Sequence, residues 1–254
     1  MIHAGLDVGS RTIKLVIFDG AVRNTAVIET GVNPLKRCEE LLSGKDYDRL
    51  VVTGYGRHLV APVLKGEVVS EIKAFATGAY HEFPDCRTVV DIGGQDSKVI
   101  LLSEKGDVQQ FEMNDRCAAG TGKFLEIMAH TLETDISGIG KLALSATKKV
   151  KINSMCTVFA ESEVISLIAK GEDSNAIALS LHEAVTNRIA GMCHKVGLRE
   201  KVVFAGGGAL NPCLRKLLCK KLGVEFIIPK NPQIVGALGA AILAGTRSKK
   251  QGEK

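Results

Sequence analysis

The 254-residue sequence predicts an α/β protein with two related lobes that clamp a nucleotide. Three observations support this. One short pattern occurs twice, beginning at Asp7 and again at Asp91. It consists of an Asp, a β-branched residue, a Gly and a small residue, followed after three variable positions by a Lys. A third glycine cluster, starting at Gly206, follows a buried strand-like segment. Strand-like and helix-like segments alternate along the chain, as they do in α/β proteins.

We expect the first lobe to span residues 1–86. Apolar and polar residues alternate on both sides of a glycine-containing turn, which predicts a hairpin, and a later helical stretch ends at Phe83-Pro84. The predicted strands and helix of this lobe cover residues 2–8, 13–19, 50–53 and 72–81.

The second lobe is expected to span residues 87–231. Apolar residues spaced three and four apart predict helices after Thr121, after Glu161 and around Leu214. The other predicted strands and the long helix cover residues 88–91, 98–102, 202–204 and 174–196. Residues 232–254 are expected to form a helix, about residues 234–247, that packs back on the first lobe, followed by a frayed tail.

Composition argues against several classes of function. The net charge of +5 is modest, aromatic residues make up 4% of the chain, and there is no Trp, so nothing indicates nucleic-acid binding. No segment is long and apolar enough to span a membrane, and the start of the chain does not read as a signal peptide. The seven cysteines, an odd number, are typical of thiols in a reducing compartment. We therefore expect a cytoplasmic protein.

The two repeated loops are predicted to hold the phosphates of a nucleotide. Glycine lets consecutive backbone N–H groups approach an anion closely. Asp7 and Asp91 are candidates to hold Mg²⁺ through its waters from opposite walls. The predicted phosphate-binding residues are Gly9, Ser10, Arg11 and Lys14 in the first loop and Gly93, Gly94, Gln95 and Asp96 in the second.

The third glycine cluster is the candidate site for the nucleoside. Gly206, Gly207 and Gly208 would let an adenine or ribose lie against the backbone, and Asn211 could hydrogen-bond to it. A different segment, residues 120–123, resembles the end of a P-loop. Cys117 and Phe124 stand where that motif requires Gly and a hydroxyl residue, so it is not a P-loop.

Together these loops resemble the actin, Hsp70 and sugar-kinase superfamily, which implies a two-lobed ATPase with duplicated β-hairpin phosphate loops. Gln95 cannot accept a proton, but it can orient a water, which favours a slow, conformationally coupled ATPase with Gln95 as the catalytic residue. Asp96 leaves open a small-molecule kinase, and an Hsp70-like binding module is a third possibility, although the chain has no appended peptide-binding domain.

Two cysteines precede predicted helices in distinctive segments, Asn-Asp-Arg-Cys-Ala-Ala-Gly-Thr-Gly around Cys117 and Cys-Thr-Val-Phe-Ala-Glu-Ser-Glu from Cys156. A helix start favours a thiolate or an anionic cluster. Buried structural thiols are the commoner fate of free cysteines.

These segments and loops are similar to the ATP-dependent activators of 2-hydroxyacyl-CoA dehydratases, a family that also supplies ATPase subunits of benzoyl-CoA reductase. The resemblance implies that Cys117 and Cys156 ligate a [4Fe–4S] cluster, and that Gln95 lies by the hydrolytic water. Such a cluster is held by four thiolates, and each chain supplies two, so a homodimer with one shared cluster is expected.

The implied function is an ATP-dependent donor of a low-potential electron. A ferredoxin or flavodoxin would reduce it, and its partner would be an iron–sulfur enzyme, either dehydratase-like or a double-cubane cluster protein. Arg11 departs from the Ser or Thr that family members often carry there, so nucleotide affinity or the resting state is expected to differ.

Overall fold

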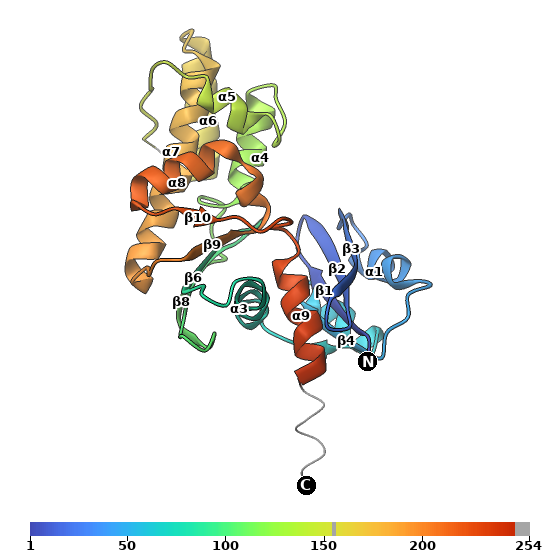
Figure 1. The fold of residues 1–254 in the computed structure, drawn as a ribbon. Helices are drawn as coiled ribbons and strands as arrows, with labels where there is room; N and C mark the ends of the chain where they lie inside the picture. The colour runs from blue at the N-terminus through green and yellow to red at the C-terminus, as the bar shows by residue number, and fades with distance from the viewer. Residues whose placement is uncertain (154–155, 247–254) are drawn as a thin grey trace.

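The computed structural model describes residues 1–153 and 156–246 and contains two five-stranded mixed sheets (Figure 1). Helices α3 (Glu71–Glu82) and α9 (Val235–Thr246) lie between the sheets, and a group of helices extends beyond the second sheet. Residues 154–155 of the Cys156 segment and the predicted tail after residue 246 lie outside the described residues.

The first sheet has the strand order β3-β2-β1-β4-β5. Strands β1 and β2 form the predicted hairpin, and Asp7 pairs in register with Lys14. Strand β4 runs parallel to β1 on its other side. The strands and helices of this part are β1 (His3–Val8), β2 (Thr12–Phe18), β3 (Val22–Glu29), α1 (Pro34–Leu42), β4 (Arg49–Thr53), α2 (Arg57–Val63) and β5 (Glu67–Val68).

The second sheet repeats this topology, with the order β8-β7-β6-β9-β10 when read from the same side. Asp91 pairs in register with Lys98, as Asp7 pairs with Lys14. The parallel neighbour β9 places Ala205 opposite Asp91, as β4 places Thr53 opposite Asp7. Its strands are β6 (Thr88–Ile92), β7 (Ser97–Leu102), β8 (Val108–Asn114), β9 (Val202–Ala205) and β10 (Phe226–Ile227).

The largest hydrophobic core lies between one face of the second sheet and the helices that cover it, and includes Phe124, Met128, Leu181 and Phe204. Helix α7 (Ser174–Val196) has thirteen buried residues, so it forms the centre of this layer. The helices are α4 (Gly122–Thr131), α5 (Ile139–Leu144), α6 (Thr157–Ala169), α7 (Ser174–Val196) and α8 (Pro212–Leu222), with a 3-10 turn η1 (Gly207–Leu210) before α8.

The predicted α/β fold class is confirmed. The two hairpins, the strands β4 and β9, and the helices α3, α4, α6, α7, α8 and α9 all occur where the sequence predicts them. Strands β3, β8 and the two short edge strands were not predicted, nor were helices α1, α2 and α5. In the described part of the chain, no helix is long and apolar enough to cross a membrane.

Helices α3 and α9 cross in close contact because both carry glycine at the crossing. A Cβ on Gly239 would stand 1.8 Å from the Ala74 carbonyl oxygen, and one on Gly78 would stand 2.1 Å from that of Val235. The two helices also share apolar contacts with both sheets. The crossing therefore joins the two halves of the chain.

Replacing Gly239 by alanine is expected to lower the free energy of unfolding by about 1–3 kcal/mol, because two backbones must separate. Gly191 is the matched control, since it lies exposed inside α7 with no atom within 4 Å of an added Cβ. Gly191→Ala should raise stability by about 0.5–1 kcal/mol. Urea denaturation measures both, and equal effects of the two changes would contradict the close crossing.

Candidate nucleotide site and cysteine loops

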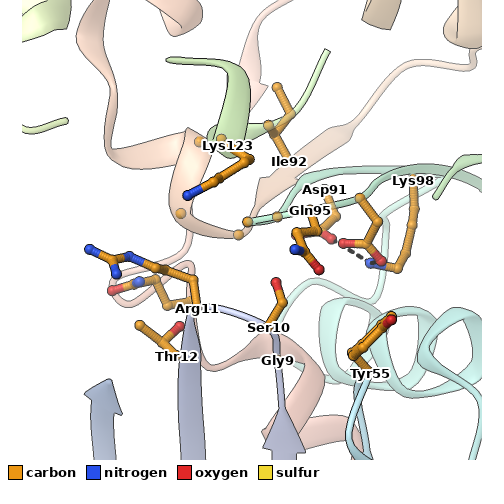
Figure 2. Close-up of a pocket in the computed structure, with 18 of the residues that line it drawn as sticks. Gly9, Ser10, Arg11, Thr12, Tyr55, Asp91, Ile92, Gln95, Lys98 and Lys123 are labelled. Carbon is orange, nitrogen blue, oxygen red and sulfur yellow. Dashed lines mark hydrogen bonds and ion pairs between the residues drawn. The ribbon is translucent and has the colours of Figure 1, made fainter. Parts of the chain in front are cut away.

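A cavity of about 860 Å³ lies where the two phosphate loops and the third glycine loop meet. Figure 2 shows Ser10 rising from the first loop toward Gln95 of the second, with Arg11 and Lys123 on opposite walls. The cavity is lined by every residue predicted to bind nucleotide or magnesium, namely Asp7, Gly9, Ser10, Arg11, Lys14, Asp91, Gly93, Gly94, Gln95, Asp96, Gly206, Gly207, Gly208 and Asn211. Their roles in binding stay predictions.

The two phosphate loops have the same local architecture. In the first, the Gly9 amide donates to the Thr12 carbonyl at 3.1 Å, and in the second the Gly93 amide donates to the Asp96 carbonyl at 2.9 Å. Each loop is thus a tight turn between hairpin strands. The loops also approach each other, since a Cβ on Gly94 would stand 3.2 Å from the Ser10 Oγ.

Lys98 is the most densely paired charge in the cavity. Its Nζ lies 3.1 Å from Asp91, 2.7 Å from Asp96 and 2.8 Å from Glu71, and 5.2 Å from the centre of the Phe75 ring. The side chain is 2% exposed. An ammonium at this depth is tolerated because several carboxylates surround it.

Burial and Lys98 have opposite effects on the pKa values of the neighbouring carboxyl groups. Desolvation raises the pKa of Glu71 to about 7 even though Lys98 opposes the rise. Desolvation likewise raises the pKa of Asp91, again against the attraction of Lys98. Desolvation also acts to lower the pKa of Lys98, but the three carboxylates outweigh it and raise that pKa. The ammonium is therefore charged at neutral pH.

The two aspartates predicted to face Mg²⁺ sit in matching positions. Asp7 pairs with Lys14 at 3.2 Å, and Asp91 pairs with Lys98. The Asp91 Oδ1 atom is buried and has no hydrogen-bond partner among the described residues. Glycine follows each parallel strand, and a Cβ on Gly206 would stand 2.1 Å from that oxygen. An unpartnered carboxylate oxygen of this kind fits a hydrated cation.

Arg11 bridges the cavity. Its guanidinium lies 3.3 Å from Glu126 on α4 and 3.8 Å from Glu29 on β3. The side chain is 57% exposed, so these pairs contribute little to stability. Because Arg11 stands in the first phosphate loop and Glu126 belongs to the second half of the chain, the pair spans the two walls of the cavity.

Asn211 has a structural role that the sequence did not reveal. Its Oδ1 accepts hydrogen bonds from the amides of Cys213 and Leu214, so the side chain is the N-cap of α8. Its Nδ2 lies 3.0 Å from the Nε2 of the buried His182. Only the second Nδ2 hydrogen remains available for the predicted hydrogen bond to a nucleotide.

The segment that carries Cys117 is attached directly to the second phosphate loop. The Gly122 amide donates to the Gly93 carbonyl at 2.9 Å, and the Lys123 amide donates to the Gly94 carbonyl at 2.7 Å. Those amides are therefore engaged by protein carbonyls, which agrees with the rejection of a P-loop here. The Asn114 Nδ2 holds the same segment through the carbonyls of Cys117 and Ala119.

The seven cysteines separate by exposure. Cys117 lines the cavity and is exposed, and Cys156 is exposed at the N-cap of α6. Burial raises the pKa of the Cys38, Cys86 and Cys213 thiols to about 11 and that of Cys193 to about 12. These four behave as apolar core groups, and Cys219 is half-buried on α8.

The site thus combines duplicated phosphate loops with exposed thiols on an adjoining segment. The chain matches the model of the BadF/BadG/BcrA/BcrD ATPase family over residues 4–244. The chain belongs to this family. It is 41% identical to the (R)-2-hydroxyglutaryl-CoA dehydratase activating ATPase of Acidaminococcus fermentans, covering 97% of this chain and 98% of that one. It is 39% identical to the 2-hydroxyisocaproyl-CoA dehydratase activator of Clostridioides difficile, covering 98% and 97%.

Solved structures agree with the family assignment. The structure of the activator of the 2-hydroxyisocaproyl-CoA dehydratase from Clostridium difficile with bound ADPNP superposes with a TM-score of 0.90 at 36% identity. That comparison covers 100% of this chain and 97% of the other. A ROK family glucokinase from Streptomyces griseus shares the fold alone, with a TM-score of 0.59 and 13% identity over 97% of this chain and 100% of the other. The predicted superfamily fold is confirmed, and the chain belongs to a family of ATPases.

Several cavity residues were not predicted. Lys98 is part of the repeated pattern, but its three carboxylate partners come from separate elements, and Glu71 gave no local signal. His182, which contacts Asn211 from outside the cavity, reads in the sequence as one more residue of a helix. The repeat itself could have found Lys98, because Lys14 and Lys98 hold the same register.

Proposed function

We propose that this protein is an ATP-driven electron donor that works as a homodimer around one [4Fe–4S] cluster and delivers a low-potential electron to a partner iron–sulfur enzyme. The observation that carries the proposal is the direct hydrogen bonding of the Cys117 segment to the Gly93–Gly94 loop of the nucleotide cavity. The relatives named as dehydratase activators support the same role.

The donor set fits a shared cluster. Cys117 and Cys156 are exposed, whereas the four core thiols have raised pKa values that disfavour the thiolate a ligand needs. Within residues 1–153 and 156–246, no group of three or more His, Cys, Asp or Glu side chains is placed to hold a metal. Two thiolates from each of two copies would complete a set of four. The bound cluster would supply the single strongly reducing electron.

The surface beside Cys156 supports dimer formation. Helix α6 exposes four apolar side chains, Val158, Phe159, Ile165 and Ile168, with exposed fractions of 69%, 67%, 56% and 42%. Val158, Ile165 and Ile168 share one face of this helix, and an exposed apolar face is typical of a protein contact. A second copy that shares the cluster would cover this helix.

The chain offers a route from nucleotide to cysteine. Phosphates bound by Gly93, Gly94 and Gln95 would displace the loop whose carbonyls accept from the start of α4. Movement of lobes 1–86 and 87–231 about the cavity would then shift the Cys117 segment, with Asp7 and Asp91 holding the waters of Mg²⁺. A ferredoxin or flavodoxin would supply the electron, and the receiving enzyme would be dehydratase-like or a double-cubane cluster protein.

The proposal is tested by measuring the iron content, the acid-labile sulfide content and the solution mass of strictly anaerobic protein. About two irons per chain in a brown dimer is expected, because four iron atoms are shared by two copies. Iron-free protein in both anaerobic and reconstituted samples would overturn the proposal. Phosphate transfer to an added hydroxyl substrate would then favour the small-molecule kinase.

Gln95→Ala is expected to slow ATP hydrolysis by about 100-fold and to leave iron content and ATP affinity unchanged, since an exposed carboxamide that orients water acts only in the chemical step. Phosphate release and ATP titration measure the two properties separately. Loss of ATP binding with unchanged turnover of the bound fraction would show that Gln95 only binds nucleotide.

A further inference from the structure

His182 is a buried polar side chain that does not line the nucleotide cavity. It lies in the middle of α7 and is 0% exposed. Its Nδ1 is 2.7 Å from the Ala178 carbonyl oxygen, and its Nε2 is 3.0 Å from the Asn211 Nδ2. Because a carbonyl can only accept, Nδ1 carries the hydrogen and Nε2 is the acceptor for Asn211.

This contact fixes which way the Asn211 amide faces. The Oδ1 side accepts from the amides of Cys213 and Leu214 at 3.0 and 3.1 Å. One Nδ2 hydrogen goes to His182, and the second has no acceptor among the described residues. The amide therefore has a donor, and not an acceptor, left for a ligand in the cavity that Asn211 lines.

The surroundings leave the amide little freedom. A Cβ on Gly140 of α5 would stand 2.6 Å from the Asn211 Oδ1, so that helix packs directly against the side chain. The Asn211 backbone amide donates to the Gly208 carbonyl at 3.0 Å. Helices α5, α7 and α8 thus meet at one asparagine at the end of the third glycine loop.

We propose that His182 is a positioning residue for nucleotide binding, which holds the Asn211 amide so that its remaining Nδ2 hydrogen donates to an acceptor atom of the nucleoside. The inference rests on the proposed assignment of the Gly206–Asn211 loop to the nucleoside. Burial lowers the pKa of His182, which keeps Nε2 free to accept at neutral pH.

Three substitutions separate positioning from support of the fold. In His182→Gln the side-chain oxygen can take the place of Nε2. In His182→Asn the shorter amide can still donate to the Ala178 carbonyl but does not reach Asn211. Asn211→Ser keeps an oxygen to cap α8 and loses the Nδ2 donor.

Calorimetric titration of MgATP into the holoprotein and the melting temperature of each variant form the test. We expect His182→Asn and Asn211→Ser each to weaken binding by about tenfold, and His182→Gln to stay within about threefold of the parent, as for one lost hydrogen bond. The His182→Asn and Asn211→Ser double variant should bind no more weakly than Asn211→Ser alone. Equal weakening by Gln and Asn, or multiplied effects in the double variant, would overturn the inference.

A fourth variant distinguishes failure of this inference from failure of the loop assignment. A Cβ at Gly207 has as its nearest atom the Gln233 Nε2 at 3.9 Å, so Gly207→Leu would fill cavity space without a backbone clash. If Gly207→Leu weakens MgATP binding and His182→Asn does not, only the positioning role is wrong. If Gly207→Leu and Asn211→Ser both bind as tightly as the parent, the loop assignment is wrong and the inference fails with it.

Discussion

Replacing Cys117 or Cys156 by serine is expected to remove essentially all iron from the protein and to abolish electron delivery, while ATP binding and the fold persist. Serine removes the thiolate that a cluster requires, and in the proposed homodimer each substitution removes two of the four ligands because both copies carry it. Both side chains are exposed, so the change leaves no hole in a core. Iron and sulfide analysis, the visible spectrum and ATP titration measure the outcome.

Cys219→Ser is the matched control, because this thiol is half-buried on α8 outside both cysteine segments. It should keep the iron content and activity of the parent. If the Cys117 and Cys156 variants both keep the iron content of the parent, these cysteines are not the ligands of the cluster. Loss of iron in the Cys219 variant alone would place the metal elsewhere.

Lys98→Met is expected to lower the free energy of unfolding at pH 8 by about 3–5 kcal/mol. Methionine fills similar space but leaves the buried Asp91 and the half-buried Asp96 and Glu71 without their shared cation. Lys14→Met is the matched control, since Lys14 holds the same register in the first sheet but, among the described residues, pairs with Asp7 alone and is 15% exposed. It should cost less, about 1–3 kcal/mol, because one carboxylate and not three loses its cation.

The stability lost in Lys98→Met should be larger at high pH than at low pH. Burial already raises the pKa of Asp91, and that of Glu71 to about 7, from ordinary values of 3.8 and 4.5. A carboxyl with a raised pKa binds more protons in the folded state, so stability falls as pH rises through that window. Without Lys98 the rise is unopposed, and the deficit should be larger at pH 8 than at pH 5. Urea denaturation in magnesium-free buffer tests this, and a deficit independent of pH would contradict the buried ion cluster.

Local signals made the hairpins and long helices predictable. Asp7 and Asp91 open the same short pattern, and the turn that each pattern specifies depends only on neighbouring residues. Helix α7 begins at Ser174 and ends at Val196 as predicted, because Asp173 caps its start and Gly197 adopts a left-handed conformation at its end. The edge strands gave no such signal, since β5 and β10 contain two residues each.

The sequence by itself determined the two phosphate hairpins, the glycine loop before α8 and the two distinctive cysteine segments, because each depends on residues that are close in the chain. Only the tertiary structure decided which groups meet. Lys98 gathers carboxylates from α3, β6 and the loop before β7, and Asn211 receives His182 from α7. Such contacts arise from packing between distant segments, and packing is specified by the summed burial of many side chains, so no short pattern reveals it.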